Sequence, residues 1–172
     1  MNLEAEILKE HSKRQSLKIA RWVGNDPKRF AELMNLFLRG EYRVTQRSAW
    51  IISHCAENHQ NLITPWLSAM VKKMQEPGVH DAVKRNVVRI LQDIDIPPPL
   101  LGRVVSLLFN YLTDVEVPIA VKVFSMTVLA NVAKRKPDLR HELRITIEQL
   151  FPYSGAGFCS RARKILKQLS PT

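Results

Sequence analysis

The sequence repeats a pattern of apolar residues with a period of about 38 residues. Four segments align without gaps when they begin at Val44, Val83, Val121 and Phe158, with spacings of 39, 38 and 37 residues. Two adjacent columns of this alignment are apolar in every row: Ile51, Ile90, Val128 and Ile165, then Ile52, Leu91, Leu129 and Leu166. Such agreement indicates tandem copies of one structural unit. The alternative is an ordinary helix bundle whose helices have equal lengths by coincidence.

Each copy is predicted to be helical. Apolar residues recur at intervals of three and four, as in Phe30, Leu33, Met34, Phe37 and Leu38, which is the spacing of one helix face. No segment alternates apolar and polar residues as a half-buried strand does, and no Asn-Gly or Asp-Gly pair offers a hairpin turn. Prolines precede or open several helical segments, and glycines separate them, as expected for helix starts and ends. The sequence therefore predicts an all-α chain.

Two segments carry a resemblance to a known family. RVTQRSAWIISHCAEN and AVKRNVVRILQDID look like second helices of the HEAT repeat and its armadillo relatives, and the similarity extends over residues 27 to 169. The resemblance implies a right-handed α-α superhelix, a HEAT-like solenoid of about four to five helix pairs in one domain. We expect a degenerate cap at residues 1–24 and repeats at about 27–59, 60–95, 96–135 and 136–170. Pro65 lies inside a helical pattern, so we expect a kink there.

The resemblance also suggests where a partner would bind. In HEAT-like proteins the second helices line the concave surface, and residues three, six and ten places along each one share a face. On this basis the candidate partner-binding residues are Arg47, Trp50, His54, Asn86, Arg89, Asp93, Phe124 and Asn131. Trp50 is the strongest single candidate, because an indole beside arginines can anchor a peptide or stack on a base. The alternative is a solvated helix face with Trp50 and Phe124 turned into the core.

Positive charge is concentrated towards the end of the sequence. The chain has 26 Lys and Arg against 16 Asp and Glu, a formal net charge of +10. From Lys134 onward nine basic residues stand against three acidic ones. The candidate phosphate-binding residues are Lys134, Arg135, Lys136, Arg161, Lys164 and Lys167. This excess would attract phosphates or an acidic protein, although solubility alone is an alternative explanation. Acidic residues precede the basic residues of the first helical segment at helical spacings, as Glu10 precedes Arg14, which predicts exposed ion pairs.

The sequence contains no recognisable catalytic or metal-binding motif. It has neither a Gly-rich phosphate loop nor a Gly-x-Ser-x-Gly elbow. His54 and His59 are five residues apart and do not converge on a helix as an i, i+4 pair would. We therefore expect no enzyme activity, no cofactor, no metal and no small-molecule substrate. Alkylpurine DNA glycosylases with HEAT-like repeats are a remote alternative, suggested by Trp50, Asp93 and the positive charge.

These observations predict a non-catalytic binding module that recognises a partner protein through the concave face. Nucleic-acid binding through a basic surface is the alternative.

No apolar run approaches the roughly 18 residues of a membrane span, and no signal peptide is visible. The two cysteines, Cys55 and Cys159, form no disulfide framework, so we expect a cytoplasmic protein. Cys55 is predicted to pack as a small buried hydrophobe.

Overall fold

A computed structural model describes residues 1–170, and this part of the chain is built from helices without strands. Residue contacts divide it into two compact units, unit 1 (Met1–Ile94) and unit 2 (from Asp95 onward). The predicted all-α helical repeat is confirmed.

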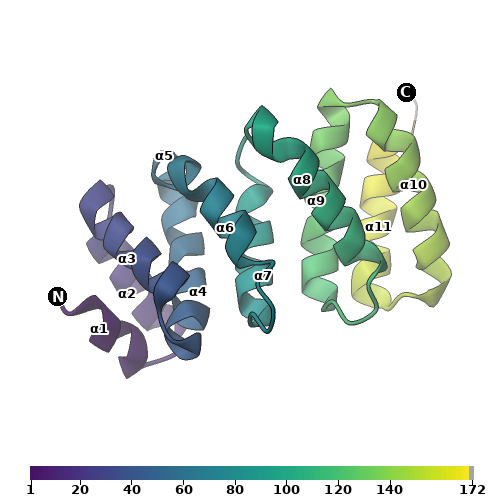
Figure 1. The fold of residues 1–172 in the computed structure, drawn as a ribbon. Helices are drawn as coiled ribbons and strands as arrows, with labels where there is room; N and C mark the ends of the chain where they lie inside the picture. Colours follow the sequence, from purple (N-terminus) through teal and green to yellow (C-terminus); the bar gives the residue numbers. More distant parts are fainter. Residues whose placement is uncertain (171–172) are drawn as a thin grey trace. The chain divides into compact units, whose positions relative to one another are not determined.

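Unit 1 contains seven α-helices and one 3₁₀ turn (Figure 1). They are α1 (Leu3–Lys9), α2 (Lys13–Val23), α3 (Pro27–Arg39), α4 (Tyr42–Asn58), α5 (Gln60–Ile63), η1 (Thr64–Trp66), α6 (Leu67–Lys73) and α7 (Asp81–Leu91). The helix starts follow the sequence signals: the Asp26 side chain accepts hydrogen bonds from the backbone N–H groups of Lys28 and Arg29, and Pro27 is the first residue of α3.

Pro65 interrupts the first helix of the second repeat. The predicted kink is confirmed, because α5 and α6 are separated by the 3₁₀ turn Thr64–Trp66. Proline has no N–H to donate to the preceding turn, and its ring crowds the carbonyl four residues earlier. The chain therefore tightens at this position and then resumes as α6.

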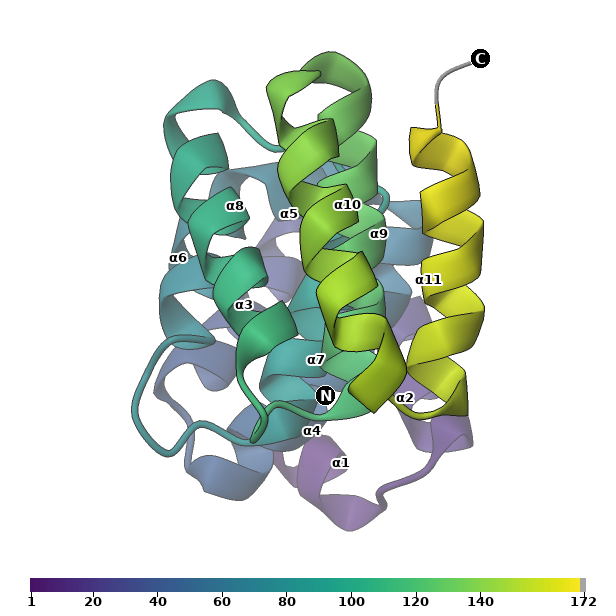
Figure 2. The ribbon, with the colours of Figure 1, turned by 90° about the vertical axis from the view of Figure 1, so that its right-hand side faces the viewer.

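In each unit one second helix forms the centre of the packing. α4 packs against α1, α2, α3 and α7 in unit 1. In unit 2, which contains α8 (Pro98–Thr113), α9 (Ile119–Arg135), α10 (Asp138–Leu150), η2 (Phe151–Tyr153) and α11 (Ala156–Leu169), α9 packs against α8, α10 and α11. The first helices α8 and α10 lie side by side in Figures 1 and 2. A second helix thus contacts its own first helix and the second helix of the next repeat.

The apolar columns of the repeat form the core of the two units. Ile51 and Ile90 are buried in α4 and α7 of unit 1, and Val128 and Ile165 are buried in α9 and α11 of unit 2. Packing of this kind hides an apolar face that a single helix pair would leave exposed to water. Leu166 is the member of the second column that is only half-buried.

Candidate functional site

The helices α4 and α7 run in the same direction across unit 1. Near their N-terminal ends Gln46 Nε2 and His80 Nε2 are 3.1 Å apart, and near their C-terminal ends Arg89 Nη2 donates to Glu57 Oε1 at 2.8 Å. Between these two links the apolar columns pack inward. Polar side chains therefore collect along the outer edge where the two helices meet, which we call the α4–α7 face.

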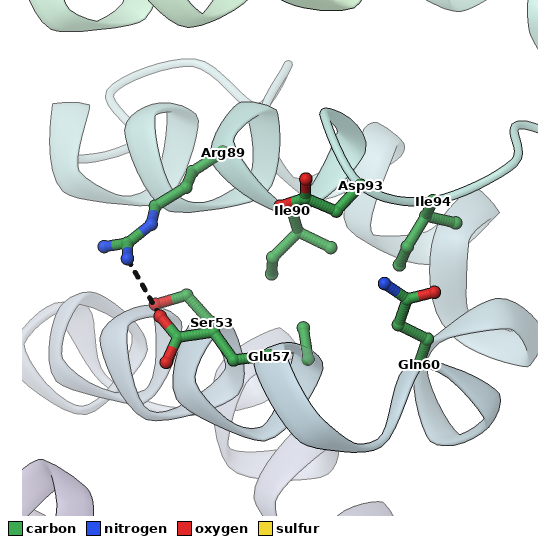
Figure 3. Close-up of a pocket in the computed structure, with 8 residues that line it drawn as sticks. Ser53, Glu57, Gln60, Arg89, Ile90, Asp93 and Ile94 are labelled. Atoms are coloured by element: carbon green, nitrogen blue, oxygen red, sulfur yellow. Dashed lines mark hydrogen bonds and ion pairs between the residues drawn. The ribbon is translucent and has the colours of Figure 1, made fainter.

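A pocket of about 360 Å³ lies at the C-terminal end of this face (Figure 3). It is lined by Ser53, Ala56, Glu57, Gln60, Arg89, Ile90, Asp93 and Ile94. Figure 3 shows Arg89 and Asp93 extending from the α7 side, with Glu57 and Gln60 on the opposite wall. Glu57 and Arg89 form an ion pair, whereas the exposed Asp93 has no ion-pair partner among residues 1–170, so the pocket carries one uncompensated negative charge.

The indole ring of Trp50 lies beside two histidine rings, those of the exposed His11 and the buried His54. The indole of Trp50 is half-buried, with the ring of the exposed His11 edge-on at 5.7 Å and the ring of His54 at 5.8 Å. His54 is 6% exposed, which corrects its expected place on an open binding face. Within residues 1–170 neither ring nitrogen of His54 makes a hydrogen bond, although Nδ1 lies 3.5 Å from Glu57 Oε2.

Two further candidates also have structural roles. Asn86 is buried, and its side-chain amide donates to the carbonyl oxygen of Ala82 at 2.8 Å, so it does not reach a partner. Arg47 is half-buried and donates to the carbonyl oxygens of Ile7 and Leu8 at 3.1 and 2.8 Å. These carbonyls lie in the last turn of α1, where backbone acceptors lack helical partners. Arg47 thereby ties α1 to α4.

The structure thus brings two predicted partner-binding residues, Arg89 and Asp93, together in one pocket. Glu57 and Gln60 also line this pocket, but they were not among the residues predicted from positions three, six and ten of each second helix. On α4 the predicted residues ended at His54, one helical turn before Glu57. Extending the same helix stripe by three residues would have found Glu57, because residues three or four apart lie on one side of a helix.

Comparison with known proteins identifies the family. The model of the HEAT repeat domain matches residues 3–169. The chain belongs to the HEAT repeat family. No curated protein and no solved structure matches the chain. Because the match begins at residue 3, the HEAT repeat region includes α1 and α2 as well as the repeats expected from residue 27 onward.

In unit 2 of this HEAT repeat protein, some of the candidate phosphate-binding residues have partners within the chain and others do not. Arg135 pairs with Asp95 at 2.7 Å, Lys134 donates to the Asn131 side chain at 3.2 Å, and Arg161 donates to the Thr127 hydroxyl. Lys136, Lys164 and Lys167 are exposed, and within residues 1–170 none of them forms an ion pair. Phe124 and Asn131 are half-buried on α9.

Residues 1–170 contain no group of three or more His, Cys, Asp or Glu placed to hold a metal ion. In the same part of the chain no helix has the length and apolar character needed to cross a membrane.

Proposed function

We propose that this chain is a non-catalytic binding module that recognises a segment of a partner protein through the α4–α7 face. The observation that carries the proposal is the pocket lined by Glu57 on α4, Arg89 on α7 and Asp93 just after α7. Side chains held on packed helices keep their geometry without a partner, which lowers the entropic cost of binding. A HEAT repeat scaffold supplies this kind of preorganised surface.

The chemistry of the pocket favours binding over catalysis. The Ser53 hydroxyl donates to the carbonyl oxygen of Trp50 at 2.8 Å, so its proton is not directed at a general base. The nearby thiol of Cys55 is buried, and this burial raises its pKa to about 12. Neither side chain is therefore an activated nucleophile at neutral pH.

The proposal can be tested by capturing partners on the full-length chain from extracts of the source cells. Asp93→Arg reverses an exposed charge in the pocket and should lower capture of the specific partner at least about tenfold. Trp50→Ala should act in the same direction by removing the aromatic anchor. Glu32→Arg is the matched control, because Glu32 is exposed on α3, outside the α4–α7 face.

Equal capture by Asp93→Arg, Trp50→Ala and Glu32→Arg would contradict the proposal. Circular dichroism and thermal unfolding of each variant separate loss of binding from loss of fold. This check matters most for Trp50, whose half-buried ring contacts two histidines. Asp93 is exposed and outside the core, so its variant should fold normally.

Binding of nucleic acid through unit 2 is the second candidate. It is favoured by Lys164 and Lys167, exposed cations on α11 that have no acidic partner within residues 1–170. We expect the affinity for an oligonucleotide to fall steeply with salt, and the combined change of Arg161, Lys164 and Lys167 to Ala to flatten that dependence. A triple control, Lys13, Lys28 and Lys72 to Ala, removes the same charge from unit 1. Equal salt slopes for the two triple variants would exclude this surface.

We place this function in the cytoplasm. Cys55 and Cys159 are both free thiols, and a reducing compartment keeps thiols in that state. Fractionation of the source cells tests the assignment. Recovery of the chain in an extracellular or periplasmic fraction would contradict it.

A further inference from the structure

Four cationic or titratable side chains lie towards the end of the α4–α7 face opposite the pocket, and the charges of the other three act on His11. They are His11 from the α1–α2 connection, Arg47 from α4, His80 just before α7, and Arg85 from α7. We call them the N-terminal cationic cluster. Arg85 lies one turn before Arg89, whose guanidinium reaches α4, so Arg85 projects from the same side of α7.

His80 is held in a defined orientation. Its Nδ1 accepts a hydrogen bond from the backbone N–H of Ala82 at 2.9 Å, its Nε2 faces Gln46, and its ring lies 5.5 Å from that of Tyr42. The acceptor Nδ1 caps the start of α7.

The other members have unused hydrogen-bonding capacity. Arg85 is exposed and makes no hydrogen bond or ion pair with any residue among 1–170. Arg47 Nε is buried without a hydrogen-bond partner in the same part of the chain. Partial burial of the His11 ring, and then the positive charges of Arg47, Arg85 and His80, lower the pKa of His11. No carboxylate offsets these charges at His11, so the cluster lacks an anion.

We propose that the N-terminal cationic cluster binds a carboxylate side chain, Asp or Glu, in an acidic segment of the partner protein. This inference rests on the proposed function and assigns a chemical character to the segment that lies on the α4–α7 face. Arg85 supplies the forked donor that a carboxylate prefers, and His11 supplies a second donor beside the aromatic surface of Trp50.

The charges around the cluster favour a peptide over a nucleic acid. Glu57 and Asp93 line the pocket at the far end of the same face, and Glu41 is exposed just before α4. A polynucleotide carries a negative charge at every phosphate and would meet these carboxylates. A peptide can place an acidic residue at the cluster and a neutral or basic residue at the pocket.

The inference can be tested on the full chain with a five-residue glutamate peptide as the probe. Three other ligands are titrated for comparison: a five-residue glutamine peptide, inorganic phosphate and a short DNA oligonucleotide. Nuclear magnetic resonance can follow the His11 ring, the Arg85 side chain and the Trp50 indole during each titration. We expect the glutamate peptide to shift these signals, and Arg85→Glu to weaken its binding roughly tenfold. Arg103→Glu, an equal charge change at an exposed position on α8, should leave binding unchanged.

Binding should also depend on pH through His11. The positive charges of Arg47 on α4, of His80 just before α7 and of Arg85 on α7 oppose protonation of this ring. A bound carboxylate reverses that effect, so affinity should rise roughly threefold as the pH falls from about 8 to about 5.5, where glutamate is still ionised. His11→Gln should remove this rise while the protein stays folded.

Three results would overturn the inference. They are equal binding of the glutamate and glutamine peptides, unchanged binding by Arg85→Glu, and tighter binding of phosphate or DNA than of the glutamate peptide at the same residues. The proposed function and this inference can be distinguished by their results. If the Asp93 and Trp50 variants lose partner capture but the peptide does not bind, the α4–α7 face remains the partner surface and only its acidic specificity is wrong.

Discussion

At the scale of single residues, burial determines the chemistry of the two cysteines. Cys55 lies inside α4, 2% exposed, and its raised pKa keeps it as an unreactive thiol. Cys159 is half-buried on α11, with its Sγ 3.4 Å from the carbonyl oxygen of Ser154. We predict that iodoacetamide modifies Cys159 in the native protein and modifies Cys55 only after unfolding. Peptide mapping measures this difference, and equal labelling of both in the folded protein would be inconsistent with the packing of α4.

Glu6 provides a pH-dependent contribution to stability. Hydrogen bonds from Lys18 and from Gln15 lower its pKa from 4.5 to about 2. A carboxylate with a lowered pKa stabilises the folded state above the pKa it has when unfolded, and this stabilisation is lost as the pH falls towards the folded value. We predict that Glu6→Gln lowers the free energy of unfolding at neutral pH and that its difference from wild type disappears near pH 2. A difference that stays constant with pH would argue against this role.

At the scale of the helices, two glycines should respond oppositely to replacement by alanine. At Gly40 an added Cβ would collide with the carbonyl oxygen of Leu36 and lie 2.8 Å from Val44 Cγ1. At Gly102, inside α8, nothing lies within 4 Å of the added atom. We predict that Gly40→Ala destabilises the protein and that Gly102→Ala stabilises it by about 0.5–1 kcal/mol through higher helix propensity. Denaturant unfolding measures both, and a Gly40→Ala variant as stable as wild type would show that the α3–α4 turn is looser than described.

Helix positions were predictable from the sequence, but the exposure of individual side chains on α4 was not. The start at Pro27 and the kink at Pro65 follow from the chemistry of proline. The expected ion pair of Arg14 with Glu10 is present, but Glu10 lies between α1 and α2, so helix spacing does not account for it. His54 was expected on an open face, yet every residue from Ile51 to Ala56 is buried. A helix that packs against neighbours on several sides has no open face over that stretch. The spacing of residues within α4 does not predict this burial, because it depends on how many other helices pack against α4.

At the scale of the whole molecule, the division into two units predicts local effects of core mutations. Leu91 and Leu129 are 2% and 1% exposed, and replacing either by Ala should cost about 2–5 kcal/mol. Repeats are stabilised mainly by their immediate neighbours. We predict that Leu91→Ala lowers hydrogen-exchange protection mainly in residues 1–94 and that Leu129→Ala does so mainly from residue 95 onward. Equal loss throughout both units would show that the chain unfolds as one cooperative block.

The sequence was more informative about the repeat than about the candidate binding surface. Periodicity predicted the apolar columns because burial constrains every repeat in the same way, as at Ile51 and Ile90. The pocket depends on Glu57 and Asp93, which occupy different columns and are joined only when α4 and α7 pack side by side. Polar side chains that belong to one repeat alone leave no periodic signal, so such a site becomes visible only in three dimensions.

Carboxyl footprinting of the chain alone and in complex with its captured partner is the most direct test of the central claim. Carbodiimide coupling modifies exposed Asp and Glu side chains, and Glu57, Asp93 and Glu32 are all exposed in the free chain. We predict that the partner protects Glu57 and Asp93 on the α4–α7 face, while Glu32 on α3 is modified as before. Unchanged modification of Asp93 together with protection of Glu32 would place the partner on the first helices and contradict the account.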